Sequence, residues 1–265
     1  MNVRRRKGKN AITIMAACVF LLLTVLYQVF AKEEVSPNQA DAPVMNAVSQ
    51  WQEVLEIGLN TIGDEVAGTV KWQGSWHTQL DPAEAANVLT SRLGLPQAEE
   101  GVLQDHTVFS ASGSVEGLRA YLNLTQLSSS EYYVVLRLEG NGAEAMTLMT
   151  EHQGMVGQSL AEEGVAVEWN AALQGTMKQS DLPKGSSLGE VMNKLENQFT
   201  DELELTSVEQ YEDQDTISRT YRSLHLPITV DSGGELVAFQ AAIHVHSETG
   251  EQEVSLGSPL LTIEY

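Results

Sequence analysis

The sequence predicts an α+β fold in which helices cover a curved antiparallel sheet, and three observations lead to this prediction. Several segments carry apolar residues at every third or fourth position, as amphipathic helices do. Other segments alternate apolar and polar residues, as half-buried antiparallel strands do. The order of strand, helix and several strands begins at Val66 and begins again at Val165, an offset of 99 residues.

The N-terminal segment differs chemically from the rest of the chain. Five Lys and Arg between Arg4 and Lys9 precede an uncharged, mainly apolar run from Ala11 to Ala31. Cations before an apolar run hold that end on the cytoplasmic side while the following chain is translocated. We therefore expect a signal peptide or signal anchor over residues 1–31. The rest should be extracytoplasmic, either secreted or anchored at the outer face of the cytoplasmic membrane.

The fate of this segment has alternatives. Its length suits the ~20 residues that cross a hydrocarbon core, which favours a retained anchor. Val29-Phe30-Ala31 offers small residues where signal peptidase reads, and we favour cleavage after Ala31. Lipidation of Cys18 is disfavoured because the apolar run continues to Leu26, whereas a lipidated cysteine begins the mature chain.

Residues 32–265 are strongly acidic and lack cysteine. They carry 10 Lys and Arg against 36 Asp and Glu, a formal charge of −26. A field of this sign repels polyanions over ~8–10 Å at physiological salt, which argues against nucleic acid and anionic headgroups as partners. Duplex binding also needs a basic stripe, whereas the Lys and Arg after residue 66 are isolated among acidic residues. We expect membrane contact only through the N-terminal segment, if it stays uncleaved.

The first half of the chain is predicted from its periodicity and its helix caps. Asp81-Pro82-Ala83-Glu84 offers a cap acceptor, a proline at the first helical position and a glutamate three residues on. Gly94 ends that helix, and Asn141 opens another with the same cap chemistry. In chain order we expect a polar tether over 32–43, a helix over 44–63, a strand over 66–77, a helix over 81–94, strands between 107 and 139, and a helix over 141–160.

The second half repeats this pattern. Turn residues at 231–234 and 249–250 separate its last segments. We divide the chain into an N-terminal helix plus first α+β repeat over 44–163 and a second α+β repeat over 164–265, forming two lobes or one continuous sheet. The expected elements are a strand over 165–173, a helix containing Val191 to Phe199, and strands near 203–211, 216–226, 235–246 and 251–265.

Several landmarks give the chain a resemblance to a known family. They are Trp72-Gln73-Gly74, the Asp81-Pro82 helix start, the segment Phe109 to Gly113, and the segment Gly257 to Tyr265. In these the chain resembles the YwmB family, exported proteins of Gram-positive spore-formers with a TATA-box-binding-protein-like (TBP-like) fold. The resemblance covers nearly everything after the tether. It implies duplicated β-α-β(n)-α units with a curved sheet, and it brings no established activity.

Two histidines are the best candidates for a metal site. His244 and His246 are two residues apart in a predicted strand, so their side chains point to the same face. A zinc or copper site would need a third ligand, and none stands at a recognisable spacing. We therefore favour two solvated histidines and expect no metal or other cofactor.

No complete catalytic motif is recognised in the sequence. It contains no S-x-x-K or H-E-x-x-H pattern, and its G-x-S-x-G match, Gly185-Ser186-Ser187-Leu188-Gly189, does not directly follow a predicted strand, as a nucleophile elbow requires. Paired carboxylates could hydrolyse a glycan, but with 36 acidic residues no pair stands out. Trp72, Trp76 and Trp169 could form a glycan-binding platform, although tryptophan on a strand is more often core, which we favour.

These observations predict an exported, non-enzymatic, envelope-associated binding module of unknown partner. An envelope protein or cell-wall component would dock on the polar face of the sheet or along a strand edge. The alternative is a cell-wall glycan binder or a weak envelope hydrolase that uses paired carboxylates.

Overall fold

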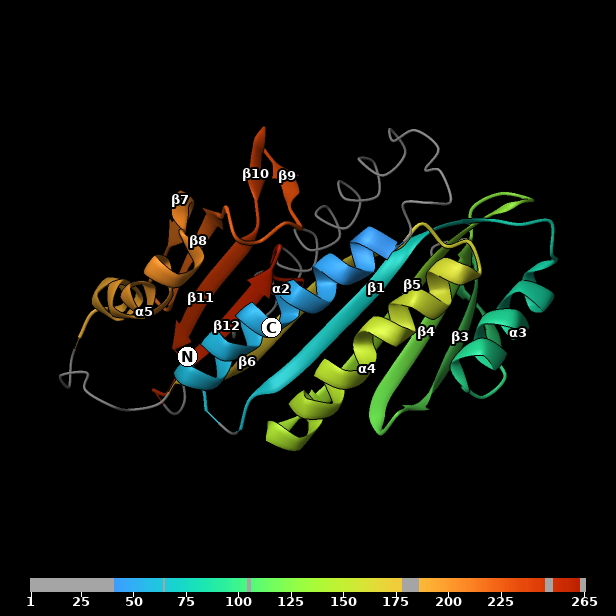
Figure 1. The fold of residues 1–265 in the computed structure, drawn as a ribbon, viewed down its shortest axis with the longest axis horizontal. Coiled ribbons are helices and arrows are strands. Elements are labelled where there is room, and N and C mark those ends of the chain that lie inside the picture. Colours follow the sequence, from blue (N-terminus) through green and yellow to red (C-terminus); the bar gives the residue numbers. More distant parts are fainter. Residues whose placement is uncertain (1–40, 64, 104–105, 178–185, 246–249, 263–265) are drawn as a thin grey trace, which may run out of the picture. The chain divides into compact units, whose positions relative to one another are not determined.

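The main feature of the protein is a ten-stranded antiparallel sheet combined with helices (Figure 1). The computed structural model describes residues 41–63, 65–103, 106–177, 186–245 and 250–262, so the predicted signal peptide or signal anchor lies outside the described residues. The α+β fold and the large antiparallel sheet are confirmed.

The described helices are α2 (Asp41–Thr61), α3 (Pro82–Leu93), α4 (Gly142–Glu162) and α5 (Leu188–Leu203). The described strands are β1 (Ala67–His77), β2 (Glu99–Leu103), β3 (His106–Val115), β4 (Leu118–Gln126), β5 (Glu131–Asn141), β6 (Glu168–Thr176), β7 (Thr206–Glu212), β8 (Thr216–Arg222), β9 (Val230–Ser232), β10 (Glu235–Val237), β11 (Phe239–Val245) and β12 (Gln252–Ser258).

The strands extend in both directions from a central pair, β1 and β6. Beyond β1 the order is β5, β4, β3 and β2, and beyond β6 it is β12, β11, β8 and β7. On each side the last strand of a meander, β5 or β12, therefore returns to pair with the first strand. The small ribbon of β9 and β10 is inserted between β8 and β11. Because β1 pairs with β6, the two halves form one continuous sheet rather than two lobes.

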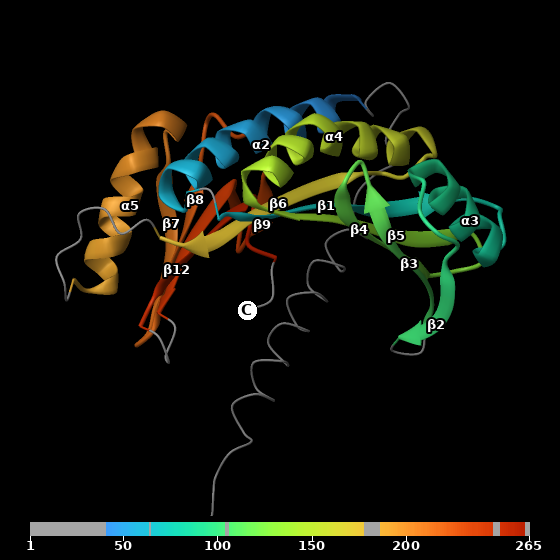
Figure 2. The ribbon, with the colours of Figure 1, turned by 90° about the horizontal axis from the view of Figure 1, so that it is seen from below.

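The helices lie on one side of the sheet (Figure 2). Helix α2 packs on α4 and contacts β6 and β12, whereas α4 contacts β5 and β1. Helix α3 lies against β3, and α5 lies against β8 and β11. Among the described helices, none packs on the opposite side, which we call the uncovered face. None of them is long and apolar enough to cross a membrane.

Burial alternates along the strands as the period of two predicts. In β1, Val70, Trp72 and Trp76 are buried beneath the helices, while the alternate residues Lys71, Gln73 and Ser75 are only partly buried. Trp169 is buried in the same core, and its Nε1 donates to the side-chain oxygen of Gln153 (3.1 Å). Trp72 Nε1 donates to the backbone oxygen of Gln153 (3.0 Å). These three tryptophans are core residues and do not form an exposed platform.

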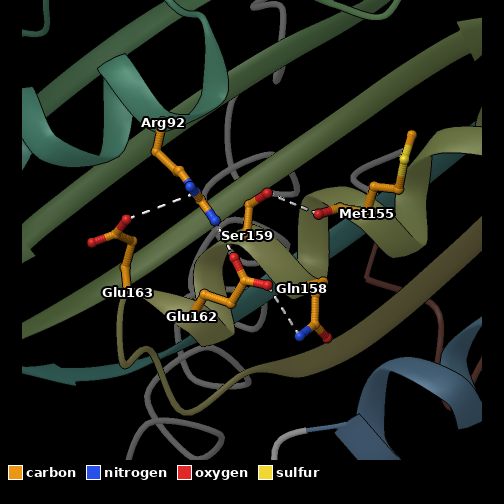
Figure 3. Close-up of polar contacts among 6 residues, drawn as sticks. All are labelled: Arg92, Met155, Gln158, Ser159, Glu162 and Glu163. Atoms are coloured by element: carbon orange, nitrogen blue, oxygen red, sulfur yellow. Dashed lines mark hydrogen bonds and ion pairs between the residues drawn. The ribbon is translucent and has the colours of Figure 1, made fainter.

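The predicted start and end of α3 are confirmed. The Asp81 carboxylate accepts from the Glu84 backbone N–H (2.9 Å), and Gly94 ends the helix with a left-handed φ of 67°. Arg92 in its last turn pairs with Glu162 and lies 3.8 Å from Glu163, which joins α3 to the C-terminal end of α4 (Figure 3). The side chains of both ion pairs are exposed or partly exposed, so we expect the pairs to contribute little to stability.

Some predicted element boundaries and one predicted helix cap are wrong. Helix α2 begins at Asp41, inside the predicted tether, and the Asn141 side chain makes no cap hydrogen bond. The strand expected from residue 165 begins at Glu168, because the Ala166 N–H donates to Ser75 and only an isolated bridge joins Val165 to Trp76.

Other strand predictions also change. The strand expected over 235–246 is broken into β10 and β11 at residue 238, whose N–H donates to Tyr221 (2.9 Å). The last strand ends at Ser258, before a cis Ser258–Pro259 bond. The sequence prediction misses β2, which is exposed along its whole length.

Candidate functional site

A cleft of about 750 Å³ opens on the uncovered face over β1, β3, β4 and β5. Its floor contains one row of residues that stand opposite one another in neighbouring strands. Ser112 in β3 is opposite Tyr121 in β4, Tyr121 is opposite Arg137 in β5, and Arg137 is opposite Lys71 in β1. Alternate residues of a strand share a face, so these four side chains all line the cleft.

A second row fixes the orientation of Arg137. Arg119 and Glu139 are opposite each other in β4 and β5. One Glu139 oxygen lies 2.9 Å from Arg137 Nε, and the other lies 3.6 Å from Arg119 Nη2. The Arg137 Cζ atom lies 4.8 Å from the centre of the Tyr121 ring, a cation–π contact. The Arg137 guanidinium is therefore held on one edge by a carboxylate and on one face by an aromatic ring.

The surroundings of Lys71 disfavour its charged form. It stands directly opposite Arg137, and like charges in that position repel. Within the described residues, no carboxylate forms an ion pair with it. Burial, together with the Arg137 charge, lowers the pKa of Lys71 from 10.5 to about 8.

The charge of the cleft is opposite to that of the chain. Lys71, Arg119 and Arg137 are three of the ten Lys and Arg in residues 32–265, and they line the cleft with two acidic residues, Glu99 and Glu139. The lining is thus net positive by one charge. The interpretation of the Lys and Arg as isolated is wrong here, because strand pairing gathers residues that are far apart in the sequence.

The last described residues form one border of the cleft. Asn170 in β6 donates to the Leu260 carbonyl (2.7 Å) and accepts from Thr262 Oγ1 (2.7 Å). The Leu261 N–H donates to Gln240 Oε1 in β11 (3.0 Å). These contacts hold the segment 259–262 on the uncovered face, where Thr262 joins the cleft lining. The part of the cleft over β3, β4 and β5 lies away from this segment.

His244 is not among the residues that line the cleft. His244 Nδ1 lies 2.9 Å from Thr216 Oγ1 and the residue is opposite Glu253, while His246 lies outside the described residues. Within the described ranges, no three His, Cys, Asp or Glu side chains are grouped to hold a metal ion.

We expect Lys71→Gln to stabilise the protein by about 1 kcal/mol at pH 7, because it removes a desolvated charge opposite Arg137. The pKa of Lys71 is lower in the folded protein than in the unfolded chain, so the charged lysine destabilises the fold by its full amount below pH 8. This destabilisation decreases as the pH rises from about 8 to 10.5, because the folded lysine loses a proton that the unfolded chain keeps. Urea denaturation of both proteins at pH 7 and pH 9.5 measures the difference. A less stable variant, or an equal difference at both pH values, would contradict this placement.

Comparisons with known proteins add no functional information. No protein-family model matches the sequence, and no curated protein matches it. Among solved structures, DynU16, a protein in the dynemicin biosynthetic locus, is 9% identical with a TM-score of 0.20, covering 71% of this chain and 86% of its own. The immunity protein TplEi of a T6SS from Pseudomonas aeruginosa is 8% identical with a TM-score of 0.19, covering 76% and 86%. Similarity this low supports no argument about function.

Proposed function

We propose that the protein is an exported, non-catalytic binding module that docks an envelope component on the uncovered face of its sheet. The observation that carries the proposal is the polar cleft on a sheet face that the described helices leave bare. Export is supported by the basic and apolar N-terminal segment. A sheet buried on one side and polar on the other offers a broad, rigid docking surface, and residues on strands hold their positions well.

The proposal includes a duplicated, TBP-like architecture. Its support is the mirrored strand order on the two sides of β1 and β6, with a helix after the first strand of each half. Helix α4 packs on β5 and β1, and α2 packs on β12 and β6, the matching strands of the other half. The resemblance to the YwmB family agrees with this architecture and with export.

The face is a better docking surface than the edges of the sheet. Edge strand β2 has five residues, including Glu99 and Glu100, and edge strand β7 contains Glu209 and Glu212. Short, acidic edges oppose the addition of a further strand. The cleft, by contrast, combines cations with neutral groups such as Asn123, which can donate and accept hydrogen bonds.

The hydrolase alternative would place its two carboxylates in this same cleft, where the lining offers Glu99 and Glu139. Both Glu139 oxygens face guanidinium groups, which occupy the positions a substrate would need. This observation favours binding over hydrolysis. A glycan binder would use Tyr121 and the neutral polar side chains of the same lining.

The test is retention of the purified full chain by isolated cell envelopes. We expect Ser112→Trp, which places a bulky ring on the exposed cleft floor, to reduce retention at least tenfold. Gln52→Trp is the matched control, because Gln52 is exposed on α2 at the helix-covered side. Equal retention of both variants would contradict docking on the uncovered face. Release of soluble glycan fragments by the wild type, but not by Glu139→Gln, would replace the binding module with the hydrolase.

A further inference from the structure

Two cations in the cleft have bonding capacity that the protein does not use. Lys71 offers three ammonium donors, and within the described part of the chain no carboxylate meets them. Arg137 uses its Nε for Glu139 and one ring face for Tyr121. Its terminal nitrogens can still form paired hydrogen bonds with two oxygens of one anion.

The arrangement is suited to a ligand rather than to stability. Lys71 and Arg137 repel each other across β1 and β5, and burial of Lys71 adds to the cost. A negative oxygen between them would remove the repulsion and satisfy both donors at once. Glu139 and Tyr121 hold the guanidinium in place beforehand, so little order is lost on binding.

The small net positive charge of the cleft lining favours a ligand group that carries one negative charge. The lining carries a net charge of +1, while residues 32–265 carry −26. A group with several negative charges would exceed the local positive charge and meet the repulsive field of the chain. Carboxylates and phosphodiesters carry one charge and at least two acceptor oxygens.

The rest of the cleft indicates a polar, neutral remainder of the ligand. The volume of about 750 Å³ is larger than a carboxylate or phosphodiester alone needs. Ser110, Ser112 and Asn123 offer hydroxyl and amide groups at one end of the cleft. Such groups suit the hydroxyls of a sugar or the amides of a peptide.

We propose that this cleft is a binding site for a singly charged oxyanion, a carboxylate or a phosphodiester, that bridges Lys71 and Arg137 and belongs to a larger polar envelope molecule. The inference rests on the proposed docking at the uncovered face and adds the chemistry of the group that is recognised.

The experiment follows the Lys71 side chain by NMR in the full chain labelled with ¹³C-lysine, the signal being assigned by its loss in Lys71→Gln. Sodium acetate and sodium dimethyl phosphate are the two probes, each compared with sodium chloride at equal ionic strength. An anion bound beside the ammonium favours its charged form, so the probe should raise the pKa of Lys71 above its value in chloride. Arg222→Gln removes a cation that pairs with Glu235 outside the cleft lining and is the matched control.

We expect Arg222→Gln to bind each probe as the wild type does, and Arg137→Gln to bind about tenfold more weakly. In Arg137→Gln without a probe, the pKa of Lys71 should already be higher, because one cause of its depression is gone. Stronger binding of acetate identifies a carboxylate ligand, and stronger binding of dimethyl phosphate identifies a phosphodiester.

No effect of either probe beyond that of chloride would overturn the oxyanion site, and so would an equal effect in Arg137→Gln. The envelope retention experiment is independent of this outcome. Retention that depends on Ser112 without an effect of the probes would leave the docking face intact and remove only the oxyanion chemistry. Binding of the probes without envelope retention would support the oxyanion site and remove the docking of an envelope component.

Discussion

Gly74→Ala is expected to destabilise the protein by about 3 kcal/mol or more, because the added methyl group would collide with backbone atoms. A Cβ at residue 74 would lie 1.9 Å from the Ala166 oxygen and 2.7 Å from the Ala166 carbonyl carbon. These are backbone atoms of the segment before β6, which pairs with β1, so no side-chain rotation relieves the contact. The β1 strand and this segment would have to move apart at this point.

Gly101→Ala is the matched control for this substitution. Gly101 also lies in a strand, β2, but its nearest atom would be the Val108 oxygen at 3.9 Å, an ordinary contact. We expect a change within about 0.5 kcal/mol. Urea denaturation of both variants measures the effects. If Gly74→Ala were as stable as Gly101→Ala, β1 and the segment before β6 would not approach as described.

Gln50→Leu is expected to cost about 2–3 kcal/mol, because it leaves buried or partly buried polar groups without partners. The Gln50 side chain accepts from the Ile228 N–H (2.7 Å) and donates to the Ile228 carbonyl (3.0 Å). It also donates to Ser258 Oγ (2.6 Å) at the end of β12. Leucine has a similar size but makes none of these three hydrogen bonds.

Gln52→Leu, on the exposed side of the same helix, controls for the change in helix composition. We expect it to stay within about 0.5 kcal/mol of the wild type by thermal or urea denaturation. Comparable losses in both variants would show that Gln50 does not anchor α2. The contrast matters because α2 precedes β1 in the sequence but covers β6 and β12, two strands of the second half of the sheet.

Local signals in the sequence were sufficient for some elements. The start of α3 depends on Asp81, Pro82 and Glu84, whose interactions involve only neighbouring residues. The alternation in β1, β4 and β5 correctly predicts which residues are buried, since one face of each strand meets the helices. A period of two needs no knowledge of the pairing partner.

Other elements depend on contacts that no local pattern contains. Val165 and Val167 extend the alternation of β6, but the chain leaves the regular ladder where Ala166 approaches Gly74. Strand β2 has the polar start Glu99-Glu100-Gly101 and forms by pairing with β3. Neither feature follows from periodicity.

The cleft was missed for the same reason. Lys71, Arg119 and Arg137 each occupy an ordinary polar position of an alternating strand, and each is alone in its own segment. Only the pairing of β4 with β5 and of β5 with β1 brings them together. Their gathering therefore depends on register, which the single sequence does not specify.

The measurement that tests the docking face most directly is in-cell photocrosslinking of the full-length protein. A photoreactive residue replaces Asn123 in the cleft or, as the control, Gln52 on α2. We predict one dominant adduct with an envelope component from position 123, none from position 52, and at least a tenfold weaker adduct when Lys71→Gln is added. An adduct from position 52 with none from position 123 would contradict docking on the uncovered face.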